Sequence, residues 1–143
     1  MMRVVGLSVA LMVLIPSIHK LKPAEPVIPE LVKNINNYRA RHGLPPMIYS
    51  PELQKAAERH AADMAAYNRM SHTGSDGSNF SMRARAAGFP MMGGGEISAG
   101  GNINEAGSMW AQSPGHNAQM LSNRKYIGAA GVGEFSCAVF GDK

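Results

Sequence analysis

The sequence lacks several features that would assign it to a common class of protein. It has 143 residues and a single cysteine, Cys137, which excludes both an intramolecular disulfide and a cysteine-based zinc site. Its net charge is +4, but the first 22 residues hold three basic residues and no acidic one. The rest of the chain therefore has almost equal numbers of basic and acidic residues and lacks the basic stripe of a nucleic-acid-binding protein. We exclude nucleic acid as a partner.

Common catalytic and metal-binding motifs are also missing. The glycine-rich run 93–101 has no Gly-Lys-Ser or Gly-Lys-Thr and therefore does not match a P-loop. Residues 60–63 lack the glutamate and the second histidine of a zinc protease helix. Asp76-Gly77 has no further calcium ligands around it, and no serine lies in a Gly-x-Ser-x-Gly elbow.

The longest apolar run is short and lies at the N-terminus. It covers 12 residues, 4–15, follows Arg3, and is shorter than the roughly 20 residues of a membrane span. This layout is typical of a secretory signal, although an uncleaved anchor stays open. Three prolines in 20–29 predict an extended linker. We therefore predict an exported protein, secreted or periplasmic, with a signal peptide or N-terminal anchor plus linker at 1–25. Any membrane contact would come only through that segment.

The remaining sequence predicts one domain of helices and short strands. Ser50 and Pro51 form a cap followed by a first-turn proline, and the helix after them buries a face that includes His60. The alternating run around Cys137 predicts a strand in which the thiol is a small buried apolar group. We predict helices over 30–42, 51–70, 80–87, 103–112 and 114–121, and strands over 126–132 and 134–140. We predict no regular element for the glycine-rich segment 91–102.

Three polar residues are candidates for a functional site. His72 opens a polar loop directly after a long helix, and His116 lies in the first turn of a predicted helix, where free N–H groups lower the pKa of a histidine. Glu96 is the only charged residue between Arg85 and Glu105. His60 is expected to be a hydrogen-bonded histidine of the core or the rim of a cleft.

These three residues allow more than one interpretation. Two histidines and a carboxylate suit zinc or another divalent cation, with one position left for water. Glu96 is equally compatible with an exposed position in a loop. A third interpretation is structural, in which the three side chains only tie loops together by hydrogen bonds.

The order of short motifs resembles a known family. A helix ends near Gly43-Leu44-Pro45-Pro46, and an alanine-rich helix follows Ser50-Pro51. Next come Ser71-His72-Thr73, Gly95-Glu96, Trp110, Ser113-Pro114-Gly115-His116, Ile127-Gly128 and Val139-Phe140-Gly141. This order is similar to that of the bacterial SCP-like branch of the CAP superfamily, which includes cysteine-rich secretory, antigen 5 and pathogenesis-related proteins. The resemblance covers residues 29–141.

The resemblance implies a fold and a cleft. The fold is α+β, an α-β-α sandwich with a small antiparallel sheet between helical layers. The cleft would be lined by His72, Glu96 and His116, with Ser113 at the position of a second acid in family members that carry one. His72, Glu96 and His116 would then be the metal ligands, for zinc or another divalent cation, and the missing acid predicts modest affinity.

The expected function is therefore non-enzymatic. We expect a monomeric module that binds a small ligand, such as a lipid or a cell-wall fragment, or an envelope protein. The alternative is a metal-dependent hydrolase, peptidase-like, in which Glu96 serves as ligand or general base.

Overall fold

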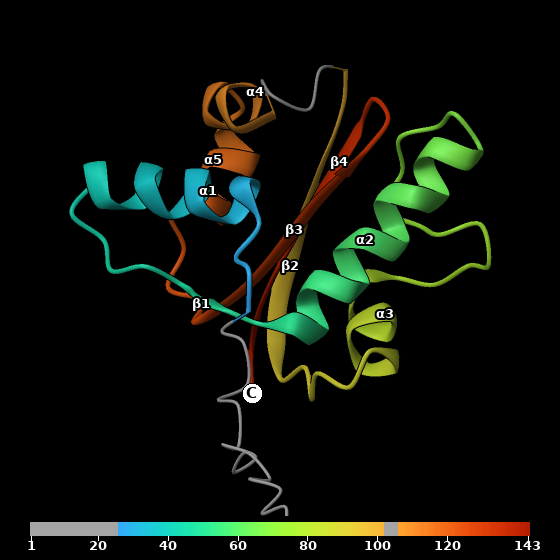
Figure 1. Ribbon diagram of the computed structural model, residues 1–143, viewed down its shortest axis with the longest axis horizontal. Coiled ribbons are helices and arrows are strands. Elements are labelled where there is room, and N and C mark those ends of the chain that lie inside the picture. Colours follow the sequence, from blue (N-terminus) through green and yellow to red (C-terminus); the bar gives the residue numbers. More distant parts are fainter. Residues whose placement is uncertain (1–25, 102–105) are drawn as a thin grey trace, which may run out of the picture.

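The computed structural model describes residues 26–101 and 106–143. Its sheet has four strands and lies between two layers of helices (Figure 1). The leader predicted at 1–25 and the start of the helix predicted at 103–112 lie outside the described residues. The elements in chain order are α1 (Glu30–Arg41), β1 (Ile48–Tyr49), α2 (Pro51–Ala66), α3 (Phe80–Ala86), β2 (Gly93–Gly100), α4 (Ala106–Gln112), α5 (Pro114–Met120), β3 (Tyr126–Val132) and β4 (Phe135–Asp142). Within the described residues, no helix is long and apolar enough to span a membrane.

The strands lie side by side in the order β1-β3-β4-β2. β4 pairs antiparallel with both β3 and β2, as an antiparallel sheet requires. The two-residue β1 differs, because it pairs with β3 in parallel. The backbone N–H groups of Ile48 and Ser50 donate to Lys125 and Ile127, so the segment after α1 joins the sheet edge on its way into α2. The sheet is therefore mixed, with an antiparallel body.

Both faces of the sheet are buried, which confirms the predicted sandwich. On one face, α2 and α3 cover Cys137 and Val139, and on the other α1, α4 and α5 cover Ala138 and Phe140. Alternate β4 side chains thus enter separate apolar cores, as expected for a central strand between two layers. Cys137 is fully buried, in agreement with its predicted role as a small apolar group.

The second predicted helix begins as expected and ends early. The Ser50 hydroxyl accepts from the N–H of Leu53 at 3.2 Å, which confirms the predicted cap. The helix ends at Ala66 rather than near Met70, because Asn68 adopts a φ of 47° and breaks the helical path. The chain after Asn68 therefore leaves the helix and runs to the sheet, where His72 contacts Glu96.

The glycine-rich segment around Glu96 is a strand, and the expectation of no regular element there was wrong. Its glycines permit close approach to the neighbouring strand β4 and to helix α5. A Cβ at Gly94 would lie 2.3 Å from the carbonyl oxygen of Phe140, and one at Gly95 would lie 2.3 Å from Oε1 of Gln119. Glycine has a low strand propensity, so the local sequence predicts a loop, while pairing with β4 and packing against α5 select the strand.

Candidate functional site

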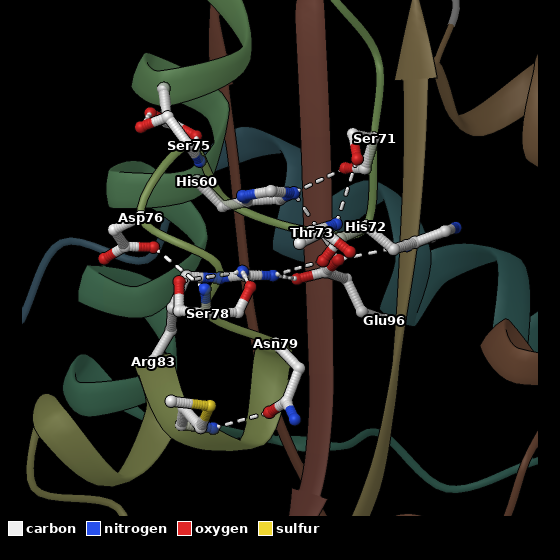
Figure 2. Close-up of polar contacts among 12 residues, drawn as sticks. His60, Ser71, His72, Thr73, Ser75, Asp76, Ser78, Asn79, Arg83 and Glu96 are labelled. Carbon is white, nitrogen blue, oxygen red and sulfur yellow. Dashed lines mark hydrogen bonds and ion pairs between the residues drawn. The ribbon is translucent and has the colours of Figure 1, made fainter.

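Glu96 carries its carboxylate on β2 into a buried position between the sheet and the α2–α3 layer. Its side chain is 1% exposed, which makes the predicted exposed-loop alternative wrong. Oε2 accepts a hydrogen bond from Nη2 of Arg83 at 2.7 Å, and Oε1 lies 3.0 Å from Nδ1 of His72 (Figure 2). A buried carboxylate requires such partners, since an unpaired charge in this position would be strongly destabilising.

Arg83 lies on α3 and is itself 2% exposed. Besides Glu96, its guanidinium donates to the carbonyl oxygens of Ser78 at 2.6 Å and His72 at 3.2 Å. These two carbonyls stand near the two ends of the loop 72–78. One side chain thus holds the loop closed and joins it to β2. The planar, five-donor guanidinium is well suited to several acceptors at once.

His60 lies behind this ion pair on α2 and is fully buried. Its Nε2 is 2.6 Å from the carbonyl oxygen of Ser71 and 3.6 Å from Oε1 of Glu96. The carbonyl oxygen of Ser71 can only accept a hydrogen bond, so Nε2 carries the proton of this contact. The prediction of a hydrogen-bonded core histidine is confirmed, and this histidine also fixes the backbone next to His72.

His116 and Ser113 lie on the α5 side and line a separate pocket of about 470 Å³. The other lining residues are mainly apolar: Met70, Ser98, Ala99, Gly100, Met109 and Trp110. Burial lowers the pKa of His116, and the charge of His72 lowers it further. The pKa shift has the direction predicted from the sequence, and its causes are burial and the nearby imidazole of His72.

The structure thus brings only some of the predicted site residues into contact. His72 and Glu96 are in contact, and His116 is near enough to His72 for the two imidazoles to interact electrostatically. Ser113 is the N-cap residue of α5 without making a side-chain capping bond.

The donor set does not fit a metal centred on Glu96. Both carboxylate oxygens are engaged, one by a guanidinium that would repel a divalent cation. Across residues 26–101 and 106–143, no three His, Cys, Asp or Glu side chains are grouped as metal ligands. The predicted ligand set of His72, Glu96 and His116 gains no support from this geometry.

Sequence reasoning missed Arg83 altogether. A signal was present, because Glu96 is isolated from other charges in a glycine-rich apolar stretch and would need a basic partner if buried. Arg83 and Arg85 are the nearest basic residues before it in the chain. Only the fold distinguishes them: Arg83 faces Glu96, while Arg85 is exposed and donates to the carbonyl oxygen of Met91 at 2.7 Å.

Comparison with known sequences gives one family match. The sequence profile of the cysteine-rich secretory protein family (CAP) matches residues 32–133, which is more than half of the chain. A search of curated proteins finds no match.

Solved structures give similar folds at low sequence identity. An outer surface protein from Borrelia burgdorferi has a TM-score of 0.70 and 21% identity, with 79% of this chain and 90% of that chain covered. An extracellular protein containing an SCP domain from Bacillus anthracis has a TM-score of 0.72 and 23% identity, covering 84% and 45%. A cysteine-rich secretory protein from Staphylococcus aureus has a TM-score of 0.65 and 15% identity, covering 79% and 37%. This chain spans less than half of the latter two.

Proposed function

Because this chain belongs to the cysteine-rich secretory protein (CAP) family, we propose that it is an exported, non-enzymatic binding module of the cell envelope or extracellular space. It holds a small ligand or a segment of a partner in the pocket lined by Ser113 and His116, which His72 and Glu96 do not line. Export fits the extracellular and outer-surface descriptions of two structural neighbours, and it fits the predicted leader.

The pocket next to His116 is the observation that carries this proposal. It combines an apolar wall, which includes Trp110 and two exposed methionines, with the polar groups of Ser113 and His116. Small-molecule sites typically have this composition, with a few polar groups fixing the orientation of a ligand in an apolar cavity. Methionine side chains adapt readily to different ligand shapes.

The hydrolase alternative is less well supported by the same geometry. A general base needs a free lone pair directed at a water or a substrate. Glu96 is 1% exposed; Oε2 accepts a hydrogen bond from Arg83, and Oε1 is in contact with Nδ1 of His72. The carboxylate that the alternative requires is therefore occupied within the protein.

Trp110 provides a direct test, since it lines the pocket and is the only tryptophan in the sequence. We would titrate the protein with lauric acid, a sterol and a muramyl dipeptide while recording tryptophan fluorescence. The proposal predicts a saturable change with at least one of them. Met70→Glu should abolish that change, because it places a charge in the apolar wall.

Met82→Glu is the matched control. Met82 is 54% exposed and Met70 is 57% exposed, but only Met70 lines the pocket. The control should bind like the unmodified protein. Absence of saturable binding with all three compounds, or equal loss of binding in both variants, would contradict the proposal.

A further inference from the structure

We infer that the indole N–H of Trp110 orients the ligand in the pocket beside α4 and α5, and that the ligand presents to it an uncharged hydrogen-bond acceptor on an apolar body. The acceptor is a carbonyl oxygen, as in a ketone, an ester or an amide. This inference rests on the proposed binding function. It adds to that function the chemical class of the ligand and the side chain that recognises it.

The first observation is that the indole nitrogen of Trp110 is buried without a partner. The residue is fully buried on α4, and its Nε1 makes no hydrogen bond. An indole N–H can only donate, and a buried one normally has an acceptor, because an unpaired buried donor is destabilising. Trp110 therefore carries a donor whose acceptor is not supplied by the fold.

This unpaired N–H is unusual for the helical layer in which it lies. Arg39 of α1 is 3% exposed, and its guanidinium donates to three backbone carbonyl oxygens. Tyr38 on the same helix donates its hydroxyl hydrogen to Oδ1 of Asn117 at 2.6 Å. Within the part of the chain that the structure describes, Nε1 of Trp110 is the only buried side-chain nitrogen or oxygen of α1, α4 and α5 without a partner.

The second observation is the pocket of about 470 Å³ that Trp110 lines together with Met70 and Met109. These two methionines are 57% and 40% exposed, so they form an outer part of the wall. Their unbranched side chains adapt readily to a neighbouring group, and a ligand that enters between them can reach the indole.

The composition of the pocket decides which acceptor fits. The lining residues that the structure describes include no lysine and no arginine, so a carboxylate or a phosphate would be buried without a strong cationic partner. A pure hydrocarbon would fill the apolar wall but leave the indole N–H unpaired. An uncharged carbonyl on an apolar chain matches both the wall and the donor.

NMR tests the hydrogen bond on the unmodified protein. Trp110 is the only tryptophan in the sequence, so the ¹H–¹⁵N spectrum contains a single indole signal. The probes are 2-hexanone and 2-methyl-1-hexene, in which a C=CH₂ group replaces the carbonyl. Both should shift methionine methyl signals in a saturable manner, and only the ketone should move the indole proton downfield. An indole proton that responds equally to both probes, or to neither, would overturn the inference.

Trp110→Phe shows whether the N–H contributes to affinity, because it keeps an aromatic wall and removes the donor. The ratio of the alkene Kd to the ketone Kd should be about fivefold larger in the unmodified protein than in the variant, as expected for one hydrogen bond of ~1 kcal/mol. Comparing ratios cancels the different hydration of the probes and any loss of packing in the variant.

Tyr38→Phe is the matched control. It removes a hydrogen-bonding group from an aromatic side chain of the same layer, but Tyr38 does not line this pocket, so the ratio should stay unchanged. Equal ratios in Trp110→Phe and the unmodified protein would overturn the inference and leave the proposed binding function standing. Tighter binding of hexanoate than of 2-hexanone would overturn the uncharged class. Saturable binding of neither probe would overturn the inference together with the pocket on which the proposed function rests.

Discussion

Arg83→Met should be among the most destabilising single substitutions in this protein. It removes the cation from a pair in which the side chains are 2% and 1% exposed, and it leaves the Glu96 carboxylate buried. At 2.7 Å and an effective dielectric constant of about 20, the lost attraction is about 6 kcal/mol before solvation is considered. Breaking a buried pair from one side typically costs about 3–5 kcal/mol in the free energy of unfolding. The carbonyls of Ser78 and His72 also lose their donor, so we expect the upper half of this range.

Urea unfolding measures this loss, and a double-mutant cycle shows its origin. Arg83→Met/Glu96→Gln should be more stable than Arg83→Met, because the second change removes the uncompensated charge. Arg85→Met is the control on the same helix, since Arg85 is exposed, and it should cost less than about 1 kcal/mol. A loss below about 1 kcal/mol for Arg83→Met, or strictly additive effects in the cycle, would show that the pair does not hold the loop and strand together.

Three further predictions follow from packing and from ionisation. Gly128→Ala should destabilise the protein by several kcal/mol in urea unfolding, because a Cβ would lie 2.1 Å from the backbone N of Gln54, whereas Gly107→Ala meets no atom within 4 Å and serves as control. Hydrogen bonds from the hydroxyl and the backbone N–H of Ser78 lower the pKa of Asp76 to about 2. Because this value lies below the ordinary 3.8, the stabilisation is present above about pH 4 and is lost as the pH falls toward 2. Asp76→Asn should therefore melt with a weaker pH dependence in that window. Burial, and then the charge of Glu96, raises the pKa of Cys137, so its thiol should react with a disulfide reagent only after unfolding, and rapid reaction in the native state would be the contrary result.

The sequence predicts those elements in which local signals and packing agree. Ser50-Pro51 marks the start of α2, and the alternation at Phe135–Phe140 marks β4, because caps and two-residue periodicity are local properties. The resemblance adds the layer arrangement, which the structure confirms. β2 was not predicted, since its run of glycines has the propensity of a loop and becomes a strand only against β4 and Gln119.

The candidate site was predictable to the same limited extent. His72 was identified by its residue type and its place after a helix, and Glu96 by the lack of other charged residues near it in the sequence. The fold places Nδ1 of His72 3.0 Å from Oε1 of Glu96. The identity of the buried cation was not predictable, because Arg83 and Arg85 differ only in the helical face on which they lie. Two residues along a helix amount to a rotation of about 200°, which places one arginine inside and the other in solvent.

The position of β4 in the sheet determines when this protein can fold. It is the last strand in the chain, yet it lies between β3 and β2 and supplies the hydrogen-bonding partners of both. During synthesis β2 therefore emerges some 40 residues before β4, the strand with which it pairs in this sheet. Until β4 is made, the backbone groups of β2 lack their partner strand, and both apolar cores lack the β4 side chains that complete them. A chain of this topology gains its stability in one late step, and a nascent chain stalled before residue 135 should be a preferred client of chaperones.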